Sequence, residues 1–132
     1  MVITDERVAE LRRHWEDGFN QYDVDLVMGP IDQDIVFSSP FVQRRTGDPA
    51  KVTVEGYDAF RDYIEDSMVR LPGIRYAIES AVVSPQTVVF LYNFTFADGQ
   101  AFSGVDYLRL TESGKITEWR CHYPRAFIDA RL

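Results

Sequence analysis

The second half of the chain alternates apolar and polar residues, and this pattern limits the possible folds most strongly. Four extended segments follow one another at residues 74–84, 87–96, 101–111 and 116–123. The short turns between them are rich in Gly, Ser, Asp and Pro, and their lengths are typical of antiparallel hairpins. The sequence therefore predicts an antiparallel meander for this half of the chain.

The first half carries helical spacing instead, with apolar residues at intervals of three and four. Helices are expected at residues 4–22, 23–28 and 56–70, and a strand at 34–39. Thr4 and Asp23 have the side chains of helix N-caps, and Pro40 should end the strand. Residues 41–45 fit either a strand or a loop. The order of elements predicts one α+β domain over residues 1–132, with three N-terminal helices packed on a curved, mainly antiparallel sheet.

Charge and composition exclude several partners. The 132 residues include 14 Lys and Arg against 21 Asp and Glu, a formal charge of -7. No basic run is present, which disfavours nucleic acid and anionic membranes as partners. The charged N-terminus has no apolar signal segment, and no apolar run reaches the ~20 residues of a membrane span, so a cytoplasmic location is expected.

Metal and cofactor sites are not expected either. Cys121 is the single cysteine, which excludes an internal disulfide and a cysteine-based zinc cluster. The two histidines, His14 and His122, are far apart in the sequence, and no acidic motif accompanies them. The chain has no glycine-rich phosphate loop. The sequence predicts no metal and no cofactor.

Asp106 is the residue most strongly linked to chemistry. Alternation places it on the same face as Phe102, Gly104 and Leu108, so its carboxyl group points toward the apolar side of the sheet. Burial raises the pKa of a carboxyl group, which suits a general acid or base or a neutral hydrogen-bond donor. The alternative is that Asp106 bonds to core Tyr, Trp or Asn side chains and has a structural role only.

The last extended segment leaves two registers open. In the first, Trp119, Cys121 and Tyr123 point inward and form an aromatic wall, while His122 points outward. A slip of one residue would exchange the two sets and bring His122 beside Asp106. The first register is the prediction, because it buries the aromatic residues.

The order of elements and three local sequences together resemble a known superfamily. The sequences are FNQYDVDLVMGPIDQDIVFSSP, GYDAFRDYI and VDYLRLTESGKITEWRCHY. They resemble the NTF2-like superfamily and, within it, the SnoaL-like and ketosteroid-isomerase-like branch, over nearly the whole chain. This resemblance implies a cone-shaped fold, a deep pocket between helices and sheet, and often a homodimer through the outer sheet face. It implies no single activity, because the fold hosts isomerases, cyclases, dehydratases and non-catalytic binders.

The resemblance also assigns positions within a ketosteroid-isomerase site. Asp106 matches the protonated Asp of the oxyanion hole in that enzyme. Its general base corresponds to Ser39 here, and its oxyanion Tyr corresponds to Trp15. A serine is no base at neutral pH, and an indole N–H donates a hydrogen bond without exchanging the proton. The ordinary isomerase mechanism is therefore disfavoured.

Residues 87–96 are apolar on both faces, so alternation does not orient them. The resemblance points Val89, Leu91 and Asn93 inward. The outward residues would then be Phe90, Tyr92, Phe94 and Phe96. Such an aromatic surface would need a partner, which favours a homodimer through the sheet.

The sequence predicts a protein that binds a small, apolar or aromatic, carbonyl-bearing molecule. Asp106 is the candidate catalytic residue. The expected binding residues are Trp15, Phe19, Ser39, Tyr63, Asn93, Trp119 and Tyr123. An enzyme of this kind would be a cofactor-independent isomerase, cyclase or dehydratase. The rival is a non-catalytic ligand-binding or dimerisation module.

Overall fold

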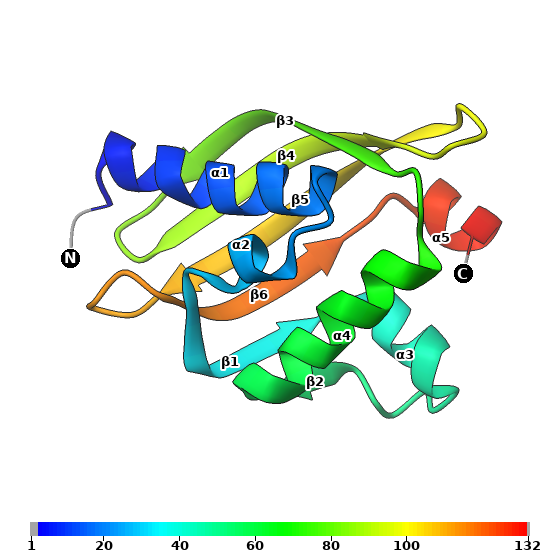
Figure 1. Cartoon of the computed structure of the whole chain (residues 1–132), viewed down its shortest axis with the longest axis horizontal. Helices are drawn as coiled ribbons and strands as arrows, with labels where there is room; N and C mark the ends of the chain where they lie inside the picture. Colours follow the sequence, from blue (N-terminus) through cyan, green and yellow to red (C-terminus); the bar gives the residue numbers. More distant parts are fainter. Residues whose placement is uncertain (1–2, 132) are drawn as a thin grey trace.

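Five helices and six strands form the protein in the computed structural model, which describes residues 3–131 (Figure 1). The helices are α1 (Asp5–Asn20), α2 (Val24–Met28), α3 (Pro40–Thr46), α4 (Tyr57–Arg70) and α5 (Arg125–Arg131). The strands are β1 (Ile31–Ser38), β2 (Thr53–Glu55), β3 (Arg75–Val83), β4 (Thr87–Thr95), β5 (Ala101–Leu110) and β6 (Ile116–His122).

The strands form one sheet in the order β2-β1-β6-β5-β4-β3. β1 runs parallel to β6, and every other neighbouring pair is antiparallel. The helices α1, α2 and α4 lie over one face of this curved sheet, and α5 lies at one end of it (Figure 1). The predicted α+β architecture and the meander are both confirmed.

Local sequence explains why α1 forms and where it packs. The Thr4 side chain accepts a hydrogen bond from the Arg7 backbone N–H at 3.1 Å, which caps the first turn. Leu11 and Trp15 are buried on the sheet side. Gly18 lets α2 approach closely, because a Cβ at this position would lie 2.6 Å from Cγ2 of Val27.

Residues 41–45 are neither strand nor loop but part of helix α3. Pro40 occupies the first turn, where its missing N–H costs nothing. The Ser39 side chain accepts a hydrogen bond from the Phe41 backbone N–H at 3.2 Å, and Gly47 ends the helix in the left-handed conformation. The interpretation of Pro40 as a strand end alone missed its second role as a helix start.

The predicted orientation of residues 87–96 is wrong. Phe90, Tyr92 and Phe94 are buried, whereas Leu91 and Asn93 lie on the outer face. Antiparallel pairing explains this, because residues directly opposite share a face and Phe90 is opposite Asp106. The aromatic residues of β4 therefore belong to the core, and they provide no argument for a dimer.

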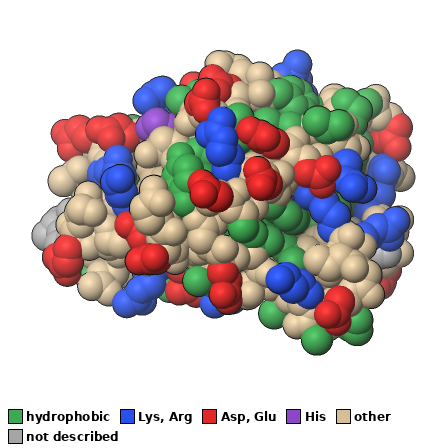
Figure 2. All heavy atoms as spheres, turned by 60° about the horizontal axis from the view of Figure 1, so that its bottom comes forward, with side chains coloured by type: hydrophobic (Ala, Val, Ile, Leu, Met, Phe, Trp, Pro, Cys, Tyr) green, Lys and Arg blue, Asp and Glu red, His purple; other side chains and the backbone are tan. Residues whose placement is uncertain are grey.

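The molecular surface carries charges of both signs. On the face in Figure 2, acidic and basic side chains are interspersed, and hydrophobic side chains gather between them. Mixed charge of this kind is typical of a solvent-exposed surface. Within residues 3–131, no helix is both long and apolar enough to span a membrane.

Candidate functional site

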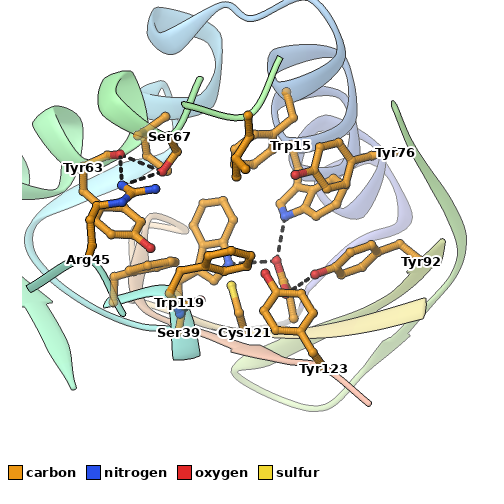
Figure 3. Close-up of a pocket in the computed structure, with 16 residues that line it drawn as sticks. Trp15, Ser39, Arg45, Tyr63, Ser67, Tyr76, Tyr92, Trp119, Cys121 and Tyr123 are labelled. Atoms are coloured by element: carbon orange, nitrogen blue, oxygen red, sulfur yellow. Dashed lines mark hydrogen bonds between the residues drawn. The ribbon is translucent and has the colours of Figure 1, made fainter. Parts of the chain in front are cut away.

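A cavity of about 70 Å³ lies between the helices and the inner face of the sheet (Figure 3). Its wall is mainly aromatic and includes Trp15, Phe19, Phe37, Tyr63, Tyr76 and Trp119. Polar side chains also line it, and one of them is Asp106 with its carboxyl group.

Asp106 is the centre of a buried hydrogen-bond network. Its side chain is 2% exposed. Oδ2 accepts from Nε1 of Trp15 at 3.0 Å and from Nε1 of Trp119 at 2.9 Å. Oδ1 accepts from the Tyr92 hydroxyl at 2.9 Å. The network joins α1 to three neighbouring strands, β4, β5 and β6, through one carboxyl group.

Gly104 makes the Tyr92 bond possible. It lies on β5 directly opposite Tyr92, two residues before Asp106 and on the same face. A Cβ at Gly104 would lie 2.6 Å from both Cζ and the hydroxyl oxygen of Tyr92. Because Gly104 has no side chain, the Tyr92 ring can lie directly over this residue of β5. Its hydroxyl group then reaches the Asp106 carboxyl group.

Comparison with known proteins identifies this arrangement as part of a family fold. The profile of the SnoaL-like domain matches residues 11–119. The chain belongs to the SnoaL-like family. A comparison with curated protein sequences found no match.

Solved structures share the SnoaL-like fold at low sequence identity. A SnoaL-like protein of unknown function from Burkholderia thailandensis has a TM-score of 0.81 at 18% identity, covering 94% of this chain and 99% of the other. A ketosteroid isomerase-like protein from Kribbella flavida has a TM-score of 0.71 at 17% identity, covering 95% and 82%. TerC, co-crystallised with polyporic acid, has a TM-score of 0.73 at 16% identity, covering 95% and 94%.

In this SnoaL-like chain, burial raises the pKa of the Asp106 carboxyl group above its ordinary value. The hydrogen bonds from Trp119, Tyr92 and Trp15 oppose this effect by stabilising the carboxylate. An indole N–H only donates, so Oδ2 must remain an acceptor. A proton on Asp106 therefore belongs on Oδ1, beside the Tyr92 hydroxyl. Asp106 can exchange a proton at this one oxygen.

The raised pKa predicts a pH dependence of stability. The folded protein binds the Asp106 proton at a higher pH than the unfolded chain, whose value is near 3.8. The contribution of Asp106 to the free energy of unfolding is therefore greatest below pH 3.8 and falls as the pH rises through the raised pKa. Urea denaturation of the wild type and Asp106→Asn across this range should show a downward slope with pH that the variant lacks. Parallel curves would contradict the prediction.

The tyrosines around the cavity are neutral hydroxyl donors. Burial raises the pKa of Tyr63 to about 12, and it also raises the pKa values of Tyr76, Tyr92 and Tyr123 above their ordinary value. Within the described part of the chain, the Tyr76 hydroxyl has no hydrogen-bond partner, although Tyr76 lines the cavity. It is therefore free to donate to a bound molecule. Burial also raises the pKa of the Cys121 thiol, which keeps it protonated.

Most of the predicted binding residues line the cavity. These are Trp15, Phe19, Ser39, Tyr63, Trp119 and Tyr123. Trp15 donates its N–H to Asp106, and the Ser39 hydroxyl oxygen accepts from the Phe41 backbone N–H as the cap of α3. Asn93 is a wrong prediction: it lies on the outer face and donates a hydrogen bond to Glu79.

The histidines lie outside the cavity. His122 is exposed and pairs with Val105 on the outer face, which confirms the predicted register. The His14 ring is hydrogen-bonded to the Leu26 carbonyl through Nδ1 at 2.7 Å, between α1 and α2. Among the described residues, no cluster of His, Cys, Asp or Glu could hold a metal ion.

Sequence reasoning missed four cavity residues that carry polar groups: Arg45, Ser67, Tyr76 and Tyr92. Tyr92 could have been found by pairing 87–95 against 101–109, since this register places Tyr92 opposite Gly104. Ser67 and Tyr76 lay within a predicted helix and a predicted strand, with no pattern that marked them. Arg45 was missed because residues 41–45 were not expected to form a helix.

Proposed function

We propose that this SnoaL-like protein binds a small, largely apolar, carbonyl-bearing molecule in the cavity and transfers a proton through Asp106. The observation that carries the proposal is a buried carboxyl group with a raised pKa in a cavity whose wall is mainly aromatic. Such a group is neutral at a higher pH than an exposed acid and is suited to proton transfer. The fold is shared with a ketosteroid isomerase-like protein and with TerC, which was co-crystallised with the small molecule polyporic acid, and this supports a small-molecule site.

The size of the cavity favours a small ligand. The cavity volume is about 70 Å³. Sites for drug-sized ligands are typically about 300–1,000 Å³. Leu71, which follows α4, lines this cavity and also a neighbouring one of about 30 Å³. A ligand with one ring would therefore require side chains shared by the two cavities, Leu71 among them, to move.

The reaction we propose is proton removal next to a carbonyl group, the step shared by isomerases, cyclases and dehydratases of this kind. Ionised Asp106 would accept the proton on Oδ1. The free Tyr76 hydroxyl would donate a hydrogen bond to the carbonyl oxygen, where negative charge develops. The residues supply both the base and the donor, so the step requires no cofactor.

The test uses 2-cyclohexenone in D₂O. We expect the wild type to accelerate deuterium exchange next to the carbonyl, and the indole NMR signals of Trp15 and Trp119 to shift on binding. Asp106→Asn should bind but lose exchange. Its amide oxygen still accepts from both indoles, and its NH₂ can donate to Tyr92.

The control is Asn93→Ala, which changes the outer face and should leave exchange unchanged. Equal exchange by Asp106→Asn and the wild type would remove Asp106 from the mechanism. Shifts of the indole signals without exchange in the wild type would favour the non-catalytic binding module. Absence of both would contradict a ligand site for this class of compound.

We also propose a homodimer through the outer sheet face, on different residues from those first expected. Val82, Leu91 and Val105 lie on this face and are 54%, 38% and 36% exposed. Exposed apolar groups of this kind favour burial against a second copy. Leu91→Lys should convert a dimer to a monomer in light scattering, whereas Val69→Lys on α4 should not. A wild-type monomer would contradict this proposal.

A further inference from the structure

Arg45 lies at the opposite side of the cavity from Tyr92, whose hydroxyl donates to Asp106 (Figure 3). It comes from the last turn of α3, and its side chain is 15% exposed. The guanidinium carbon lies 4.4 Å from the centre of the Tyr63 ring. Stacking on an aromatic ring fixes the plane of a guanidinium group and the direction of its donors.

Only one terminal nitrogen of Arg45 is used by the protein. Nη1 donates to the Tyr63 carbonyl at 3.2 Å and to Oγ of Ser67 at 3.0 Å, and it lies 3.2 Å from Oδ2 of Asp66. Nη2 and Nε have no hydrogen-bond partner among the described residues. Within the same residues, no fully buried side-chain nitrogen or oxygen lacks a partner, so these donors reach open space.

The carboxylate that pairs with Arg45 is shared with a second guanidinium group. Asp66, the counter-ion of Arg45, also pairs with Nε of Arg70 at 2.8 Å. One carboxylate therefore faces two guanidinium groups. Asp106, at the other side of the cavity, would repel an anion when it is ionised. The electrostatics favour an anionic group at the Arg45 side and a neutral polar group at the Asp106 side.

We propose that Arg45 is an anion-binding residue and that the ligand of this cavity is a carboxylate with a ring. This inference rests on the proposed function, since it assigns a substrate class to the same cavity. Nη2 and Nε would form paired hydrogen bonds with the two carboxylate oxygens, the geometry that guanidinium groups favour. The ring would lie among the aromatic side chains, and its carbonyl or hydroxyl group would point toward Asp106.

The experiment compares benzoate with benzamide, which has the same shape without the charge. Binding is measured from the NMR shifts of the two indole signals and by calorimetry. We expect the wild type to bind benzoate at least ten-fold more tightly than benzamide. Arg45→Gln should abolish this preference by weakening benzoate ten-fold or more, with benzamide unchanged. Arg45→Lys should restore part of the preference.

The matched control is Arg44→Gln, which removes the same charge from an exposed neighbour outside the cavity. It should retain the preference for benzoate. If benzamide binds and benzoate has no advantage in the wild type, the anion site is wrong while the ligand cavity stands. Equal weakening of both compounds in Arg45→Gln would show a structural role and overturn the proposal. Failure of both compounds to bind the wild type would contradict both the proposed ligand site in the cavity and the proposed anion site at Arg45.

Discussion

Replacing Asp106 with alanine should lower the free energy of unfolding by about 3 kcal/mol. The alanine leaves the N–H groups of Trp15 and Trp119 buried without an acceptor, and the Tyr92 hydroxyl loses its partner. Each unsatisfied buried group costs about 1–3 kcal/mol. Relief from burying the carboxyl group offsets part of this sum. Urea denaturation at neutral pH would measure the difference.

The matched variant is Asp106→Asn, which keeps an acceptor for both indoles. It should change the free energy of unfolding by less than about 1 kcal/mol, since both indoles keep an acceptor and the Tyr92 oxygen can accept from the new NH₂ group. A small effect of alanine would show that the indoles find other acceptors. A large effect of asparagine would show that the charge itself, rather than the acceptor, holds the network.

Replacing Gly104 with alanine should lower the free energy of unfolding by about 2–3 kcal/mol. The new methyl group would lie 2.6 Å from the Tyr92 ring, which is itself buried. Tyr92 would have to move, and its bond to Asp106 would lengthen or break. Thermal and urea denaturation would measure the loss, and the NMR signals of the indoles would report the disturbed carboxyl group.

The same substitution in a Tyr92→Leu variant tests whether the Tyr92 ring causes this loss of stability. Gly104→Ala introduced into Tyr92→Leu should cost much less than in the wild type, because the ring that it meets is gone. The double-mutant cycle should give a coupling energy of about 1–2 kcal/mol. Additive losses would contradict the close approach of Gly104 and Tyr92 as the cause.

The sequence was enough to predict the elements whose patterns are local. The helical stripe that contains Trp15 and the alternation around Asp106 follow from spacing along the chain. They predicted the inward carboxyl group and the aromatic wall that contains Trp119. These residues are positioned by their own helix or strand, so no distant part of the chain was needed to place them.

The errors arose where orientation depends on a partner. Both faces of β4 are apolar, so only its pairing with β5 decides that Tyr92 points inward and Asn93 outward. Arg45 reaches the cavity because Pro40 starts a helix, whereas the same proline also fits the end of a strand. For both segments the local sequence is compatible with two conformations of similar free energy. Tertiary contacts determine which of the two forms.

The network around Asp106 also bears on the order of folding. Two of its bonds span 14 and 13 residues, from Tyr92 and Trp119, and both form within the meander. The third, from Trp15, spans 91 residues and requires that α1 dock on the finished sheet. Closing so long a loop is slow compared with hairpin formation. These separations predict that the sheet forms its carboxyl acceptor before α1 docks on it.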